Sequence, residues 1–278
     1  MKPIVENISP MQESSFALRE FKMAAFTYPW HSHPEYELNY IKTGSGMRYV
    51  GSSIQGFAAG DLVFIGPDLP HCWLTESRGH SIVAQFDNSL FGSDFISHNE
   101  MAAIRSLMKR SAQGIRFIGT VTEEVRHSME KMLDLPPFER LLEMMSILNR
   151  LAKWKNTELL SSKGFGTIPA GQESDRERLE RINTYINVNF KKQIKLEDIA
   201  GHVNITPTAF CKYFKSRAQK SFITYLNEYR IGYACRLLKE TDFTITRIAF
   251  ECGFENIANF YRQFRKVTGH TPKGYMAQ

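Results

Sequence analysis

One pattern occurs twice in the C-terminal third of the sequence: Ile199-Ala-Gly-His-Val-Asn204-Ile-Thr-Pro-Thr-Ala-Phe210-Cys-Lys-Tyr-Phe214-Lys215, and Ile248-Ala-Phe-Glu-Cys-Gly253-Phe-Glu-Asn-Ile-Ala-Asn-Phe260-Tyr-Arg-Gln-Phe264-Arg265. Each copy opens on Ile-Ala and closes on Phe-x-x-x-Phe followed by Lys or Arg. Between these ends, an apolar residue, an Asn or Gly and a second apolar residue mark a turn. An internal repeat of this kind indicates a structural unit that is used twice.

The residue types in each copy predict a helix, a sharp turn and a second helix. Ile199, Ala200 and Val203 share one helical face, and the small alanine lets another helix approach closely. Asn204, or Gly253 in the second copy, tolerates the left-handed backbone that the turn needs. The next helix has a capping residue, a proline at its first position and two inward phenylalanines, namely Thr206, Pro207, Phe210 and Phe214. Each copy is therefore predicted to be a helix-turn-helix unit.

The segment Phe222–Leu238 between the copies has apolar residues at helical spacing. About 18 residues at a rise of about 1.5 Å give a helix of about 27 Å. Major-groove faces on one side of DNA repeat about every 34 Å, so a rigid helix of this length suits two reading units on adjacent grooves. Charge agrees with this interpretation: residues 176–278 carry +9, and the preceding residues carry −3. A basic segment of this kind indicates a polyanionic partner.

The second helix of each unit keeps polar residues opposite its phenylalanines. Thr208 and Lys212 lie there in the first copy, and Asn259 and Arg262 in the second. Such side chains read base edges in the major groove. The alternative is a plain helical bundle in which the repeat serves only packing. The repeat, the turn residues and the charge together favour DNA binding over that alternative.

From about Leu179 to Tyr275, the chain resembles the AraC/XylS-type transcription regulators. The resemblance is most specific in Ser221-Phe-Ile-Thr-Tyr-Leu-Asn-Glu-Tyr-Arg-Ile-Gly-Tyr-Ala-Cys-Arg-Leu-Leu238, Ile248-Ala-Phe-Glu-Cys-Gly-Phe254 and Phe260-Tyr-Arg-Gln-Phe-Arg-Lys-Val-Thr-Gly-His-Thr-Pro272. It implies an all-α domain with two helix-turn-helix units joined by a long helix, whose second helices, about 206–216 and 256–266, enter DNA. The residues implied in DNA contact are Thr206, Thr208, Ala209, Lys212, Lys215, Asn256, Ala258, Asn259, Arg262 and Arg265.

Two positions depart from the family pattern. Gln219 stands where the family usually has glycine, and a non-glycine residue in a left-handed helix cap costs about 1 kcal/mol. Ile257 stands where a polar residue is common, and we expect it to turn toward the core rather than touch a thymine methyl group.

The N-terminal part has a different pattern. Between about Phe16 and Asp87, short runs rich in aromatic and β-branched residues alternate with glycines, which favours a β-barrel or jelly roll. The period becomes helical between about Asn99 and Leu160. The apolar face there serves either as the core of this domain or as a dimerisation surface; its residues are Phe138, Leu141, Leu142, Met145, Leu148 and Leu151. We expect a ligand-sensing barrel at 1–98, a helical dimerisation segment at 99–160, a linker at 161–175 and a DNA-binding domain at 176–278.

A cluster of histidines and carboxylates lies near the start of the barrel, in His31-Ser-His-Pro-Glu-Tyr-Glu-Leu-Asn-Tyr-Ile-Lys-Thr-Gly44. The spacing of His31, His33, Glu37 and Gly44 resembles the first cupin motif, and His71 stands where that resemblance implies a fourth metal ligand. Three imidazoles and a carboxylate would suit Fe, Mn, Ni or Zn. Sensor domains of the regulator family resemble this barrel without requiring a metal. We therefore favour an organic-ligand pocket over a metal, with the lining residues Trp30, His31, His33, Glu35, Tyr40, His71 and Trp73.

The whole sequence is interpreted as a multidomain α and β protein, a cytoplasmic, sequence-specific DNA-binding regulator of transcription. It has no secretory signal, no membrane-spanning run and no cysteine framework. Expected partners are double-stranded DNA, a small effector such as a sugar or small acid, RNA polymerase and a second copy of the chain. No membrane partner, cofactor or enzyme activity is expected, and activation and repression both stay open as the sign of regulation. Two alternatives stay open: a metal-dependent cupin enzyme with a helical appendage, and a constitutive DNA-binding protein whose barrel only dimerises.

Overall fold

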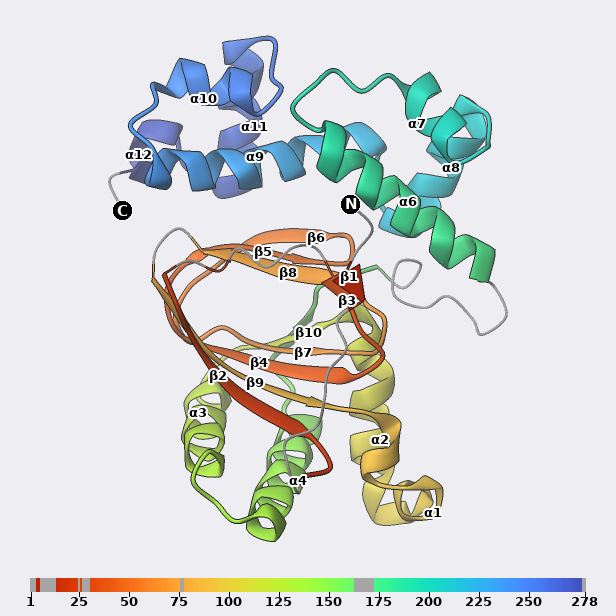
Figure 1. The fold of residues 1–278 in the computed structure, drawn as a ribbon, viewed down its shortest axis with the longest axis vertical. Helices are drawn as coiled ribbons and strands as arrows, with labels where there is room; N and C mark the ends of the chain where they lie inside the picture. The colour runs from red at the N-terminus through yellow and green to blue at the C-terminus, as the bar shows by residue number, and fades with distance from the viewer. Residues whose placement is uncertain are drawn as a thin grey trace.

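The computed structural model describes residues 4–5, 14–24, 26, 31–75, 78–162 and 173–276. An N-terminal part with two β-sheets lies below a C-terminal helical part (Figure 1). This arrangement confirms the predicted combination of a β-sheet domain and an all-α domain. No helix within the described ranges is both long and apolar enough to cross a membrane.

Two mostly antiparallel sheets face each other in the barrel. The upper sheet has the order β1-β3-β8-β5-β6, with β1 at Ile4–Val5, β3 at His31–Ser32, β8 at His71–Thr75, β5 at Gly46–Val50 and β6 at Ser53–Phe57. The lower sheet has the order β11-β10-β7-β4-β9-β2, with β11 at Thr157–Leu159, β10 at Ile115–Phe117, β7 at Leu62–Ile65, β4 at Tyr36–Thr43, β9 at Gly79–Phe86 and β2 at Ala17–Met23. The segment predicted as helical thus also supplies two short strands, β10 and β11, to the lower sheet.

Helices cover the outer face of the lower sheet (Figure 1). They are α2 (Ala102–Arg110), α3 (Val121–Met132) and α4 (Pro137–Lys153), and the short α1 (Ser93–Ser97) packs against α2. Because β4 has the barrel interior on one face and these helices on the other, both faces are buried and Tyr36–Ile41 shows no exposed alternation. The apolar face predicted on α4 is divided in the structure. Leu148 and Leu151 are buried in the domain core, whereas Phe138 and Leu142 are 66% and 50% exposed.

The C-terminal part contains seven helices in the described residues: α6 (Glu173–Asn189), α7 (Leu196–His202), α8 (Pro207–Ala218), α9 (Phe222–Glu240), α10 (Ile245–Glu251), α11 (Ile257–Thr268) and α12 (Pro272–Met276). The predicted linker falls mostly on residues 163–172, which lie outside the described ranges, and its last residues begin α6. In each unit the paired phenylalanines are fully buried: Phe210 and Phe214 on α8, and Phe260 and Phe264 on α11.

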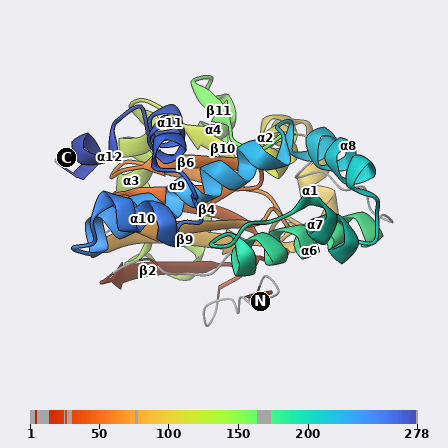
Figure 2. The same ribbon diagram turned by 90° about the horizontal axis from the view of Figure 1, so that it is seen from above.

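The long helix α9 rests on the upper sheet, against β5 and β6 (Figures 1 and 2). Barrel residues Met47, Tyr49, Ile54 and Cys72 belong to the same buried cluster as the core of the helical part. The rings of Tyr49 and Tyr229 have centroids 5.5 Å apart. The barrel therefore packs directly on the helix that joins the two helix-turn-helix units.

Candidate functional site

The first reading helix, α8, begins as its sequence predicts. The Thr206 side chain caps it by accepting a hydrogen bond from the Ala209 backbone N–H at 3.3 Å, and Pro207 follows as the first helical residue. Thr208, Ala209, Lys212 and Lys215 are all exposed. Thr206 therefore has a structural task of its own, while Lys212 and Lys215 present free positive charge on the outer face of the helix.

The second reading helix, α11, is held by its polar residues. Asn256 Oδ1 accepts hydrogen bonds from the backbone N–H groups of Ala258 and Asn259, at 2.8 and 3.1 Å. Asn259 Oδ1 in turn accepts one from Arg262 Nη2 at 2.8 Å. Arg262 and Arg265 are exposed. Asn256 thus caps the helix, and Asn259 orients the Arg262 guanidinium before any partner is bound.

Ile257 takes the orientation that its chemistry suggested, half-buried against the core cluster. The turns also have the predicted backbone. Asn204 and Gly253 adopt positive φ values of 56° and 80° in the two units, and Gln219 and Gly269 end α8 and α11 at φ 56° and 78°. The two copies therefore share one backbone design despite different side chains at these positions. The 19 residues of α9 span about 28 Å.

A cavity opens inside the barrel, between the two sheets. Its walls are Phe21, Met23, Phe26, His31, Glu37, Asn39, Ile41, Trp73, Ser81, Val83 and Gln85. Alternate residues of β4 and β9 face it, because side chains along a strand point to opposite faces in turn. Register brings the two strands together, since Asn39 pairs with Val83 and Glu37 with Gln85. The cavity is mostly apolar and aromatic with a few polar groups, which is the usual make-up of a small-molecule site.

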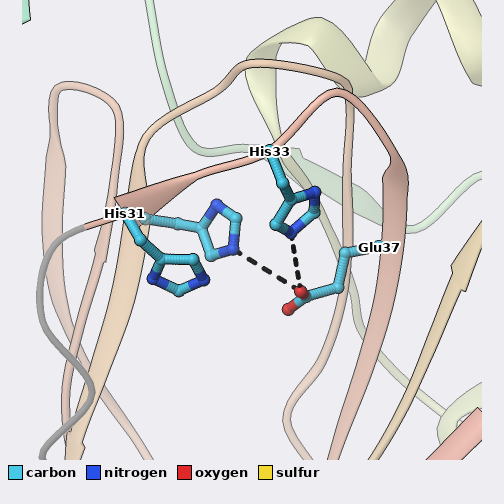
Figure 3. A group of neighbouring side chains, drawn as sticks. His31, His33 and Glu37 are labelled. Atoms are coloured by element: carbon cyan, nitrogen blue, oxygen red, sulfur yellow. Dashed lines mark hydrogen bonds and ion pairs between the residues drawn. The ribbon is translucent and has the colours of Figure 1, made fainter. Parts of the chain in front are cut away.

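Beside this cavity, four buried side chains converge: His31, His33, Glu37 and His71. One ligand atom from each lies within 4.8 Å of the others. Glu37 Oε2 lies 3.1 Å from His33 Nε2 and 3.5 Å from His71 Nε2. In Figure 3 a dashed line joins the His33 ring to the Glu37 carboxylate, and the His31 side chain lies nearby. The ring centroids of His31 and His71 are 4.3 Å apart.

The second nitrogens of two of these rings contact backbone carbonyls. His71 Nδ1 lies 2.7 Å from Leu69 O, and His33 Nδ1 lies 3.1 Å from Glu35 O. A carbonyl only accepts, so each Nδ1 carries the proton. The Nε2 atoms of both rings face Glu37. His71 Nε2 is buried, and its approach to Glu37 is not a hydrogen bond of good geometry.

Glu37 is itself fixed by neighbours. Asn39 Nδ2 donates to Oε1 at 3.2 Å, and Gln85 Nε2 donates to Oε2 at 2.9 Å. Burial acts to raise the pKa of Glu37, but the facing imidazoles of His71 and His33 outweigh burial and hold that pKa well below its usual range. An ionised carboxylate with imidazole nitrogens directed at it is the donor set that a divalent transition metal prefers. The residues present therefore fit such an ion, better than the sequence alone implied.

The cavity corrects part of the predicted lining. His31 and Trp73 line it, and His33 and His71 lie in the adjoining cluster. Tyr40 and Glu35 do not line it. Tyr40 lies on the opposite face of β4 from Glu37, packs under the helices and donates from Oη to Glu123 Oε1 at 3.3 Å. Its burial, with the Glu123 charge, raises the pKa of Tyr40 to about 12. Trp30 lies outside the described residues.

Sequence reasoning missed most of the wall. Asn39 and Ile41 follow from Glu37 by the period of two along β4, whereas Ser81, Val83 and Gln85 face the cavity through the register of β9 on β4. Phe21, Met23 and Phe26 come from the first long strand and the segment after it, and no motif marked them.

Comparisons with known proteins support a division into two functional parts. Residues 15–77 match the AraC-like ligand binding domain family, and residues 199–278 match a helix-turn-helix domain family. The HTH-type transcriptional activator RhaS of Escherichia fergusonii is 22% identical over 269 residues, covering 95% of this chain and 92% of its own length.

Other similarities are partial or distant. The regulatory protein PocR of Salmonella typhimurium is 32% identical over 101 residues, and this chain spans about a third of its length, 33%. The crystal structure of ToxT from Vibrio cholerae aligns over 95% of this chain and 98% of its own, at 15% identity and a TM-score of 0.41.

Proposed function

Since the chain is an AraC-type transcription regulator, with an AraC-like ligand-binding domain ahead of its helix-turn-helix domain, we propose that α8 and α11 read DNA while the barrel binds the effector. The observation that carries the proposal is the repeated unit itself. Two helices, each with a side-chain N-cap, a left-handed C-cap, a buried phenylalanine pair and exposed basic residues, flank one connecting helix.

Base contact is assigned to residues on the outer faces of α8 and α11 other than the two that cap these helices. Lys212 on α8 and Arg262 on α11 occupy equivalent places in the two units. A guanidinium suits the two acceptors of guanine, and the bond from Arg262 to Asn259 presents it in a fixed direction. Thr208, Ala209, Ala258 and Asn259 flank these two residues, and Lys215 and Arg265 are placed to meet phosphates. Thr206 and Asn256 support the site through their caps.

The experiment selects bound fragments from the source genome and then compares variants on the selected site. Arg262→Ala is expected to weaken binding by about 1–3 kcal/mol and to relax preference at particular base pairs, and Lys212→Ala to do so at others. Lys153→Ala is the control, because this exposed lysine lies on α4, in the N-terminal part. Binding by both reading-helix variants with unchanged sequence preference would contradict the residue assignment.

The barrel is the proposed effector domain, and the cavity is its proposed site. Aromatic and aliphatic walls with Asn39, Ser81 and Gln85 suit a small molecule with one polar end, such as a sugar or a small acid. A metabolite screen that follows the melting temperature of the full chain tests this. The effector should raise the melting temperature, and Ser81→Leu should abolish that rise by filling the cavity. An unchanged response of Ser81→Leu would place the effector elsewhere, and a screen without any hit would favour a barrel that only dimerises.

Regulation of transcription also implies partners. We place the protein in the cytoplasm as a homodimer that uses α4 as its contact surface and acts on RNA polymerase as an activator. Turnover of a substrate by the purified chain, lost in His33→Ala, would instead support the alternative of a cupin enzyme.

A further inference from the structure

We propose that His31, His33, Glu37 and His71 hold one divalent transition-metal ion, and that this ion anchors the effector through an oxygen donor. The inference deepens the proposed effector function and rests on it. The metal ion is required by the barrel and not by the helix-turn-helix units. An experiment can therefore contradict the metal site and leave the proposed DNA binding intact.

The strongest argument is the direction of the nitrogen lone pairs. Backbone carbonyls of Leu69 and Glu35 fix the protons of His71 and His33 on Nδ1. Both Nε2 atoms then point at the Glu37 carboxylate, with Oε2 3.1 Å from His33 Nε2 and 3.5 Å from His71 Nε2. A cation held between these atoms would be shared by the two ring lone pairs and the carboxylate. Metal-bound histidines almost always donate their other N–H to a carbonyl or carboxylate in this way.

The supporting residues around the cluster agree. Asn39 and Gln85 donate to the two Glu37 oxygens, which fixes the carboxylate without neutralising it. All four candidate ligands are buried, and the exposed fractions of their residues lie between 1% and 6%. Imidazole and carboxylate ligands in a site that keeps open positions suit Fe, Co, Ni or Zn better than Ca or Mg.

The cluster also borders the cavity. His31 and Glu37 line the cavity and belong to the cluster, so an ion held there has one side toward the space where an effector would lie. The remaining cavity wall is mostly apolar, with Phe21, Phe26 and Trp73 among its residues. The chemical class that fits is a molecule with a carboxylate or vicinal hydroxyl end and a compact apolar or ring-shaped body.

The first test uses the full chain, with any affinity tag removed, stripped by a chelator and titrated with Zn²⁺ or Co²⁺ alone. One ion per chain is expected, with a visible Co²⁺ spectrum and a higher melting temperature. Glu37→Gln keeps the side-chain volume and should lower the affinity more than about 100-fold, since it removes a direct ligand. His98→Ala is the matched control, because His98 is exposed and outside the cluster. If Glu37→Gln fails to fold, stoichiometry and spectrum of the unmodified chain still decide the question.

Failure to bind any divalent ion from Mn²⁺ to Zn²⁺ by the folded chain would overturn the proposal, as would undiminished binding by folded Glu37→Gln. Retained operator binding in either case leaves the proposed DNA function standing.

The second test addresses the anchor, with acetohydroxamate as the probe. Its two oxygens should change the Co²⁺ spectrum of the loaded chain. Ser81→Leu narrows the cavity without removing a ligand, so it should keep the ion and lose the response to the probe. An unchanged spectrum in the loaded, unmodified chain would mean that the ion has no open side toward the cavity, and would overturn the anchoring role.

Discussion

Gln219 ends α8 in a left-handed conformation, at φ 56°, that glycine adopts at little cost. Gln219→Gly should therefore raise the free energy of unfolding of the C-terminal part by about 1 kcal/mol, less the loss of the side-chain bond from Nε2 to Ser216 O. Gly269→Ala, the opposite change at the equivalent position of α11, is the control. Gly269 ends α11 at φ 78° with no atom within 4 Å of an added Cβ, so this change should cost about 1 kcal/mol through backbone strain alone. Urea unfolding followed by circular dichroism measures both, and a less stable Gln219→Gly would mean that the Ser216 bond outweighs the strain.

Because side chains alternate between the two faces of a strand, some residues of the barrel site could be predicted from the sequence and others could not. The spacing of His31, His33, Glu37 and His71 was readable in one dimension, and the fold brings these four together. Tyr40 is predicted from the sequence to line the pocket with them, but the structure places it elsewhere. Since it lies three positions from Glu37, it is on the other face of β4, in the core beneath the helices. The facing residues of β9 depended on strand register, which a single sequence does not fix.

Elements whose formation depends on neighbouring residues could be predicted from the sequence, and elements that depend on distant pairing could not. The cap predicted at Thr206 begins α8 in the structure, and α9 and α11 likewise begin at side-chain caps, Ser221 and Asn256. The strands β10 and β11 were not foreseen. Each has three residues, and each exists because it pairs with a strand far away in the sequence, β10 with β7. Long-range pairing of so short a segment leaves no periodic signal.

The helix α4 has an exposed apolar pair that its own domain does not cover. Phe138 and Leu142 are 66% and 50% exposed, one turn apart. As the contact surface of the proposed dimer, this pair should be sensitive to charge. Leu142→Glu is expected to weaken self-association at least 10-fold in sedimentation equilibrium, because it places a carboxylate in an apolar interface. Ser106→Glu, on the exposed face of α2, is the control and should leave association unchanged. Equal association of both variants would exclude α4 as the contact.

At the scale of the whole molecule, the barrel and the helical part share one buried cluster. The two parts lie close together at Gly232 of α9, where an added Cβ would lie 1.9 Å from Tyr49 Oη. Gly232→Ala must therefore push α9 away from β5, at a cost of about 1–3 kcal/mol. In calorimetry we expect one thermal transition for the unmodified full chain and two for Gly232→Ala. Gly201→Ala is the control, since nothing lies near its Cβ position on α7. One unchanged transition in Gly232→Ala would mean that the two parts are not coupled through this contact.

The sequence foresaw both parts of this molecule but not their contact. Tyr49 and Cys72 lie in strands whose inward residues were expected to face a barrel core, and nothing in one dimension marks which outward residues a second domain will cover. Only the tertiary structure shows that the outer face of the upper sheet packs against α9 of the DNA-binding part.

The two faces of strand β8 belong to different parts of the molecule. His71 and Trp73 face the interior, whereas Cys72 between them belongs to the cluster beneath α9. The Cys72 thiol is buried, and burial raises its pKa well above its ordinary value, so it is inert while α9 remains seated. In a variant that lacks the exposed Cys211, the rate at which a maleimide alkylates Cys72 therefore reports how often the barrel and the helical part separate. Cys72 is next in sequence to His71, which belongs to the proposed effector site.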